Sequence, residues 1–427
     1  MKKTIFSFIV LAALLLQPAA AAESITLSNG LKVILNPDRS AGIIALAVFV
    51  RAGSAYETPA DSGTANLAFA MITRGTKTRS AEELAAATEA LGVSIAASSG
   101  EDHSVISMVS TEKTFAEGSA VLFDMLLNPV FPEAELSKIK KVAISGLKAE
   151  KDDNFSYTLK RLKALMFKGD SYALDPLGTE ENIAGVTSSV LSAFYSRNFT
   201  AGRICLSVSG SFDKGAMTAL LEKSLSVIPA GGQFVKPQSA ASAEAESFAS
   251  EKMKKNQAVV MTGFFAPEFA SADYPALKLL SSVLGGGMSS KLFSTLREKE
   301  GLAYSIGTIY PSRAKTCAFI FYAGTRKENI ERIKQGFLDT AVNAGKPGYI
   351  TEKELADAKN LLVGQFRLDH QTNADRARYL GWFELSGPGF GYDAAYPEAV
   401  KAVTLEEVSK AAVKYLVQPK TFVLDNE

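Results

Sequence analysis

Residues 289–311 read SSKLFSTLREKEGLAYSIGTIYP, and this stretch predicts a helix, a tight break and a strand. Leu292, Phe293 and Leu296 give the predicted helix a single apolar face, as an amphipathic helix requires. A serine at its start can cap that helix, because the hydroxyl accepts a bond from an otherwise unpaired N–H. Gly301 follows the charged end, and a left-handed glycine commonly ends a helix. The end of the helix and the start of the strand are therefore expected to meet at one corner.

Two polar side chains stand at that corner: Arg297 near the helix end and Tyr304 at the start of the strand. An arginine in a charged helix end is usually solvated, and a tyrosine in a strand is usually half-buried core. The alternative is a functional pair over a cleft, in which a fixed cation lies beside a phenol that donates a hydrogen bond. Spacing alone favours the ordinary interpretation.

The composition is that of an ordinary globular protein. The chain has 427 residues, of which 47% are hydrophobic and 21% charged, with a formal net charge of +1. This length suffices for two or more domains, and the near-neutral charge gives no support for binding to nucleic acid. The two cysteines, Cys205 and Cys317, are too few for a disulfide framework or a zinc cluster. Two buried free thiols are expected, and a single long-range disulfide is the less favoured alternative.

The N-terminus has the pattern of a secretory signal peptide. Lys2 and Lys3 precede an apolar run over residues 5–16, and small residues at 19–22 offer cleavage sites. The run is too short to span a bilayer comfortably, and no later segment has a transmembrane pattern. We therefore expect a signal peptide over residues 1–22 and an exported, periplasmic protein.

The rest of the chain divides into two units joined by a linker. An N-terminal domain is expected over residues 23–228 and a C-terminal domain over residues 250–427. Between them, residues 229–249 are rich in Gly, Ala, Ser and Gln and have weak hydrophobic periodicity, which is typical of a linker.

The two units look like duplicates of each other. Thr187 opens a predicted helix that precedes a strand near Ile204, and Thr404 opens one that precedes a strand near Thr421. Both pairs are offset by 217 residues (404 − 187 and 421 − 204), a period that indicates domain duplication. The predicted fold class is α+β. Two homologous halves, each a mostly antiparallel sheet with helices on one face, are expected to face each other across a cleft.

The sequence also resembles a known family. LGGGMSSKLF at residues 284–293, followed by LREKEGLAYSIG at 296–307, is similar to the C-terminal signature of the pitrilysin and mitochondrial processing peptidase superfamily. These are the inverted-motif zinc peptidases, and the resemblance covers nearly the whole chain after about residue 24. It implies that both units are peptidase-like domains and that Arg297 and Tyr304 help to hold and polarise the scissile peptide.

The first half departs from that family at the metal site. The family carries H-x-x-E-H on a helix, in which two histidines bind zinc and the glutamate activates water, and a distal glutamate is the third ligand. The matching positions here are Asn66, Phe69, Ala70 and, distally, Gly146. Alanine and glycine offer no ligand atom, phenylalanine cannot take a proton, and one amide oxygen does not hold zinc. No metal ligand is therefore assigned to this chain.

The remaining candidates for a site have ordinary explanations. His103 and His370 are far apart in the sequence and are expected at the surface. Tyr379, Trp382 and Phe383 lie at helical spacing and are most simply core residues.

The resemblance implies a division of labour between two chains. This chain is expected to be the non-zinc subunit of a heterodimeric zinc metalloendopeptidase, inactive alone. Zinc is expected on a homologous H-x-x-E-H subunit, and Arg297 and Tyr304 act on the peptide substrate beside it. No cofactor is expected in this chain. The alternative is a non-catalytic peptide-binding or assembly protein on the same fold, for which a homodimer is possible.

Overall fold

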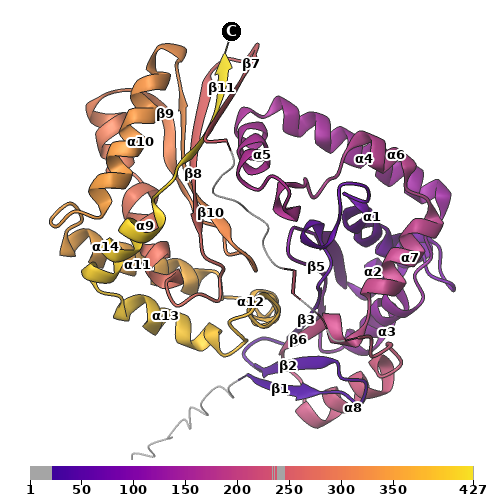
Figure 1. Ribbon diagram of the computed structural model, residues 1–427. Coiled ribbons are helices and arrows are strands. Elements are labelled where there is room, and N and C mark those ends of the chain that lie inside the picture. Colours follow the sequence, from indigo (N-terminus) through magenta and orange to yellow (C-terminus); the bar gives the residue numbers. More distant parts are fainter. Residues whose placement is uncertain (1–21, 233, 235, 238–245, 427) are drawn as a thin grey trace, which may run out of the picture.

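The computed structural model describes residues 22–232, 234, 236–237 and 246–426. The predicted signal peptide, apart from Ala22, lies outside these residues. The described chain is an α+β protein built on two sheets, each with its own set of helices (Figure 1). The predicted fold class is therefore confirmed.

The first sheet has six strands in the order β1-β2-β6-β3-β5-β4. Their bounds are β1 (Glu23–Thr26), β2 (Lys32–Pro37), β3 (Ile43–Val50), β4 (Ser94–Ser99), β5 (Ser104–Thr111) and β6 (Ile204–Gly210). The pair β2 and β6 is parallel, and the other neighbours are antiparallel. Asn29-Gly30, a dipeptide that is typical of hairpin turns, lies in the turn from β1 to β2, with Gly30 at a φ of 87°. Strand β3 is almost completely buried, as its continuous apolar run predicts.

The second sheet repeats this arrangement with one strand fewer. Its order is β7-β11-β8-β10-β9, with β7 (Phe248–Met253), β8 (Ala258–Ala266), β9 (Ala303–Ile309), β10 (Cys317–Thr325) and β11 (Lys420–Asn426). Again one pair, β7 and β11, is parallel, and the others are antiparallel. This order matches β2-β6-β3-β5-β4, so the two halves are homologous. The sequence does not predict strand β7, because it alternates exposed and half-buried residues and starts inside the polar linker segment.

Eight α-helices are described in the first half and six in the second. They are α1 (Thr64–Met71), α2 (Ala81–Leu91), α3 (Phe115–Leu127), α4 (Glu133–Asp152), α5 (Asn154–Met166), α6 (Glu180–Gly185), α7 (Ser188–Asn198), α8 (Lys214–Leu225), α9 (Tyr274–Gly285), α10 (Ile330–Ala344), α11 (Glu352–Leu368), α12 (Asn373–Ser386), α13 (Tyr392–Ala402) and α14 (Leu405–Tyr415). The sequence does not predict α6 and α13. The first is short, and the second contains Pro397, which normally interrupts a helical pattern. None of the described helices is long and apolar enough to cross a bilayer.

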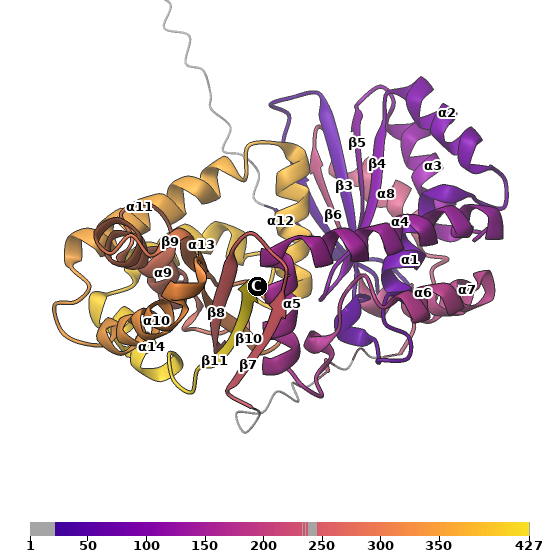
Figure 2. The ribbon, with the colours of Figure 1, turned by 90° about the horizontal axis from the view of Figure 1, so that it is seen from above.

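The two halves exchange one helix each. Helix α5 of the first half packs on β8 and β11, and helix α12 of the second half packs on β3 and β6 (Figure 2). Each sheet therefore has its own helices on one face and a helix from the other half on the opposite face, where the sequence predicted only one covered face. At two glycines, each exchanged helix lies very close to the sheet on which it packs. A Cβ at Gly381 would lie 2.5 Å from the Phe49 ring, and one at Gly263 would overlap Met166.

Candidate functional site

The segment that carries Arg297 is a π-helix. Residues 291–292 are α-helical, and Phe293–Lys299 continues from them as the wider π-helix η5. The predicted serine cap is wrong, because the Ser290 hydroxyl instead donates a 2.6 Å bond to the Gly287 carbonyl. The predicted break at Gly301 is confirmed by its φ of 65°. Since π turns are rare and occur often at functional sites, this irregularity supports a role for the segment.

The guanidinium of Arg297 is exposed and rests on an aromatic ring. Its Cζ lies 4.7 Å from the centroid of the Phe293 ring, one turn earlier in η5. Among the described residues no carboxylate forms an ion pair with it. The ring limits the motion of the side chain, while the N–H donors of Arg297 remain open to a ligand such as a peptide carbonyl or carboxylate.

Tyr304 occupies a bulge in strand β9. The register with β10 runs from Ser305 opposite Gly324 to Ala303 opposite Thr325, so that Tyr304 has no residue directly opposite. A bulge turns a side chain away from the regular pleat and is common beside active sites. Tyr304 is 55% exposed, so the ordinary interpretation of a half-buried core tyrosine is wrong.

A third residue, Arg326, contacts this site and is not predicted from the sequence. Its Nε donates a 2.8 Å hydrogen bond to the Tyr304 phenol oxygen, and its Cζ lies 5.9 Å from the centre of the Tyr304 ring. The bond uses a lone pair of Tyr304 and leaves the phenolic O–H available as a donor. No sequence signal identifies Arg326, because it reaches Tyr304 only through the shifted pairing of β9 with β10.

Arg297 and Tyr304 belong to one corner of the second sheet. The Leu302 N–H donates a 2.9 Å bond to the Leu296 carbonyl, which ties the start of β9 to η5. No hydrogen bond or ion pair between described residues links the guanidinium to the phenol directly. Strand β9 is the free edge of its sheet, on the side away from the first half (Figures 1 and 2). The pair therefore lies on an outer edge and not between the two halves of its own chain.

The residues at the family's zinc positions do not fit a metal ion. On α1, Asn66 and Ala70 are half-buried, and Phe69 is buried with its ring centre 6.2 Å from that of Tyr195. Gly146 lies on α4, which packs beside α1, and a Cβ there would lie 3.5 Å from the Leu177 side chain. Within the described ranges, no three His, Cys, Asp or Glu side chains gather where they could hold a metal.

The helix α1 nevertheless keeps a firm anchor at its N-terminus. The buried carboxylate of Glu57 accepts a 2.9 Å bond from the Gly63 N–H and a 2.6 Å bond from the Ala65 N–H. Burial raises the pKa of Glu57 to about 7, although these backbone bonds oppose the shift. The helix that carries zinc ligands in the family is thus retained here as a structural element.

Neither histidine is at the surface, so that prediction is wrong. His103 is largely buried beside Phe49, and its Nδ1 is sealed from solvent. Burial, helped by the charge of Arg313, lowers the pKa of His103 to about 4. His370 has Nδ1 2.6 Å from the Phe366 carbonyl and Nε2 2.7 Å from the Asp393 carboxylate. Cys205 and Cys317 are buried free thiols, as predicted.

Comparison with known protein families matches both halves of the chain. Residues 32–180 match the model described as insulinase (peptidase family M16), and residues 185–362 match the model described as peptidase M16 inactive domain. The chain is 27% identical over 358 residues to the uncharacterized zinc protease YmxG of Bacillus subtilis, covering 83% of this chain and 86% of that protein. It is 25% identical over 400 residues to the uncharacterized zinc protease Rv2782c of Mycobacterium tuberculosis, covering 92% and 90% respectively.

Solved structures share the fold. The peptidase M16 inactive domain from Pseudomonas fluorescens superposes with a TM-score of 0.87 at 22% identity, covering 95% of this chain and 98% of that one. A protease from Helicobacter pylori superposes with a TM-score of 0.84 at 20% identity, covering 95% and 99%. The two homologous halves of the structure agree with these matches. The chain belongs to the pitrilysin-like superfamily of M16 peptidases, as a zinc-protease-like protein with a peptidase M16 inactive domain at residues 185–362.

Proposed function

We propose that this chain is the non-zinc subunit of a two-chain zinc metalloendopeptidase. The observation that carries the proposal is the position of Arg297 and Tyr304. Both side chains are exposed at the free edge of the second sheet, in irregular backbone, within a chain whose own zinc positions hold no ligands. A pair that faces outward can meet a metal only if a second chain brings it. The expected partner is a homologous H-x-x-E-H subunit.

Each residue has a defined task in such a complex. The partner's zinc would supply the activated water. The O–H of Tyr304 donates a hydrogen bond to the oxygen of the scissile carbonyl as negative charge develops on that oxygen. The O–H is free for this role because Arg326 donates to a lone pair of the phenol oxygen and does not use the O–H. Arg297 binds a carbonyl or carboxylate of the peptide through its unpaired N–H donors.

The free edge of β9 offers a place for the substrate. Strand β9 hydrogen-bonds to β10 on one side, and its other side has no strand among the described residues. An extended peptide can add there as a further strand, held by main-chain bonds that impose little sequence preference. Export to the periplasm, expected from the N-terminal sequence, would set the peptides that the complex meets.

The test is a reconstitution with a zinc-motif homologue from the same genome. We expect the two proteins to copurify and the pair alone to cleave a quenched fluorescent peptide. Tyr304→Phe should lower kcat of the pair about 100-fold or more, as removal of one oxyanion donor does. Arg297→Ala should mainly raise KM, whereas Arg367→Ala, on the exposed surface of α11, should change neither. Unchanged turnover in both site variants would remove the assigned roles.

The second candidate is a non-catalytic peptide-binding or assembly protein. The free edge of β9 favours it, since strand addition needs no metal. It predicts peptide binding or a stable homodimer and no zinc-dependent cleavage in any mixture. Stoichiometric zinc and proteolysis in the purified single chain would overturn both candidates.

A further inference from the structure

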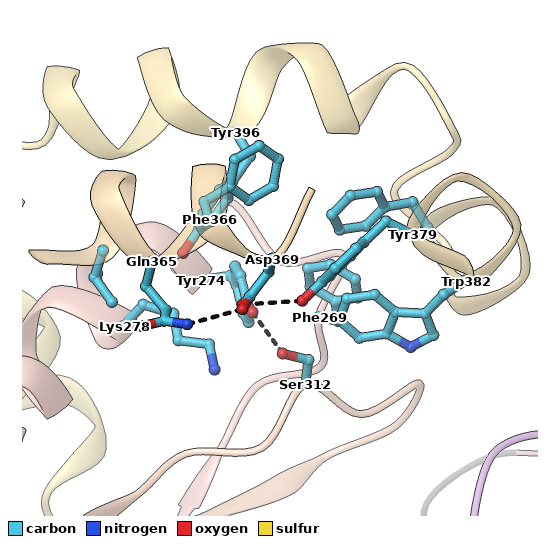
Figure 3. A pocket seen from close by; sticks show the side chains of 12 residues that line it. Phe269, Tyr274, Lys278, Ser312, Gln365, Phe366, Asp369, Tyr379, Trp382 and Tyr396 are labelled. Carbon is cyan, nitrogen blue, oxygen red and sulfur yellow. Dashed lines mark hydrogen bonds between the residues drawn. The ribbon is translucent and has the colours of Figure 1, made fainter. Parts of the chain in front are cut away.

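A pocket of about 220 Å³ opens in the second half, among helices α9, α11, α12 and α13 (Figure 3). Neither Arg297 nor Tyr304 lines it. Its walls are aromatic, and two of them, Phe269 and Trp382, stack with ring centres 4.8 Å apart. Pockets for drug-sized ligands measure about 300–1,000 Å³, so the occupant of this one is smaller.

One wall of the pocket carries a cation without a carboxylate partner. Lys278 is largely buried, with part of its surface facing the pocket. Its Nζ donates a 2.8 Å bond to the Tyr310 carbonyl and lies 5.4 Å from the ring centres of Tyr274 and Tyr310. Among the described residues no acidic side chain forms an ion pair with it. A buried ammonium is costly unless it is paired, so a carboxylate brought by a ligand would stabilise it.

A carboxylate, that of Asp369, also lines the pocket. Asp369 accepts a 2.8 Å bond from Gln365 and a 3.2 Å bond from the Tyr379 hydroxyl, which fix the carboxylate in place. Figure 3 shows the Asp369 carboxylate held between Gln365 and the Tyr379 hydroxyl, with the amine of Lys278 nearby and turned away from that carboxylate. A ligand ammonium would gain from this carboxylate and from the surrounding ring faces. Asp369 also disfavours a phosphate, because like charges repel.

We propose that this pocket binds a free α-amino acid with an apolar or aromatic side chain, whose carboxylate pairs with Lys278 and whose ammonium pairs with Asp369. A dipolar ligand satisfies both charges, and its side chain packs on the aromatic walls. The proposal does not depend on the peptidase role, because none of these residues belongs to the Arg297 corner.

The chain carries its own probe for this binding. Trp382 is the one tryptophan in the sequence, and it lines the pocket. Titration of the full chain with L-leucine or L-phenylalanine should change its fluorescence saturably. The N-acetyl derivative lacks the ammonium, and the amide derivative lacks the carboxylate. Each should bind at least about tenfold more weakly than the free amino acid. No saturable change with either amino acid at millimolar concentration, or equal affinity for the derivatives, would overturn the proposal.

Two variants separate the two charges. Lys278→Met should weaken binding of the free amino acid about tenfold or more. The weak binding of the amide derivative to the protein should stay unchanged. Asp369→Asn should also weaken binding of the free amino acid about tenfold or more, and it should leave the weak binding of the N-acetyl derivative unchanged. The matched controls are Lys353→Met and Asp357→Asn, which break an exposed ion pair on α11 and should keep wild-type affinity. Wild-type affinity in both pocket variants would contradict the assignment. If a variant unfolds, the derivative series on the wild-type chain still decides.

Discussion

At the scale of single residues, the phenol of Tyr304 is bound by a residue that the local sequence pattern does not predict, Arg326. Arg326 donates to the phenol oxygen, and a phenol that accepts a bond from a guanidinium becomes a better donor through its own O–H. Arg326 therefore acts through Tyr304 and is a positioning residue in the proposed mechanism. The neighbouring Glu328 carboxylate, 3.8 Å from the Arg326 guanidinium, is exposed and contributes little.

Replacement of Arg326 should therefore reduce the rate without abolishing it. In the reconstituted pair, Arg326→Gln should lower kcat about tenfold and leave KM nearly unchanged, since the substrate does not touch this residue in the proposed arrangement. Arg326→Lys, which keeps a cationic donor, should recover part of the loss. Glu328→Gln serves as the control. Steady-state kinetics check this, and an Arg326→Gln pair with wild-type kcat would contradict it.

The buried His103 should make stability depend on pH. Burial lowers its pKa to about 4 in the folded protein, while the unfolded chain keeps an ordinary value of about 6.5. Between these values the unfolded state binds more protons, so stability falls as pH decreases from about 6.5 toward 4. From pH 7 to pH 5 this one group should cost about 2 kcal/mol. Urea denaturation of the wild type and of His103→Gln at both pH values measures the difference, and parallel losses in the two proteins would count against it.

At the scale of elements, two contacts lock the exchanged helices onto the sheets. Helix α12 lies very close to β3. A Cβ atom placed on Gly381 would lie 2.5 Å from the Phe49 ring and 2.7 Å from the Ser207 hydroxyl. Phe49 is buried and has no room to move aside. The absence of a side chain at Gly381 therefore sets the distance between the second half and the first sheet.

A methyl group should act in opposite directions at two helical glycines. Gly381→Ala should destabilise the protein by about 1–3 kcal/mol, because it overpacks the contact of α12 with Phe49. Gly364→Ala, in the middle of α11 where a built Cβ meets nothing within 4 Å, should stabilise it by about 0.5–1 kcal/mol through helix propensity. Chemical denaturation gives both values. If both substitutions changed the stability by the same amount and in the same direction, the packing of α12 against Phe49 would not exclude a side chain at Gly381.

The sequence predicts the regular elements and fails at the irregular ones for a physical reason. The hairpin at Asn29-Gly30 and the duplication can be predicted because they depend on local chemistry or on spacing. The same holds for the start of α2, where Ser80 and Glu83 have the spacing of a capping box and form one in the structure. The π turn around Arg297 and the bulge at Tyr304 depend on which backbone groups pair, and residue periodicity does not encode that choice. The pocket is not visible in the sequence because the aromatic spacing of α12 indicates only a core helix, whereas α12 packs on the first sheet and also lines the pocket.

At the scale of the whole molecule, the halves are also joined by a buried polar contact. The segment 312–316 of the second half reaches into the first. There Arg313 Nε lies 3.0 Å from a Glu101 oxygen, and Lys315 Nζ lies 2.9 Å from Asp170 Oδ1. Lys315 and Asp170 are both buried. Charges removed from water must keep their partners, so this contact holds the halves in one relative position.

This contact and the exchanged helices together predict that the two halves unfold as one unit. Urea denaturation followed by far-UV circular dichroism and by Trp382 fluorescence should give one coincident transition. Lys315→Met should cost about 3–5 kcal/mol, because it takes the ammonium away from a buried carboxylate, and adding Asp170→Leu should recover much of that loss. Lys353→Met, which breaks an exposed pair, should cost less than about 1 kcal/mol. Two separate transitions in the wild type, or a Lys315→Met cost no greater than that of Lys353→Met, would mean that the halves are held together by the helices alone.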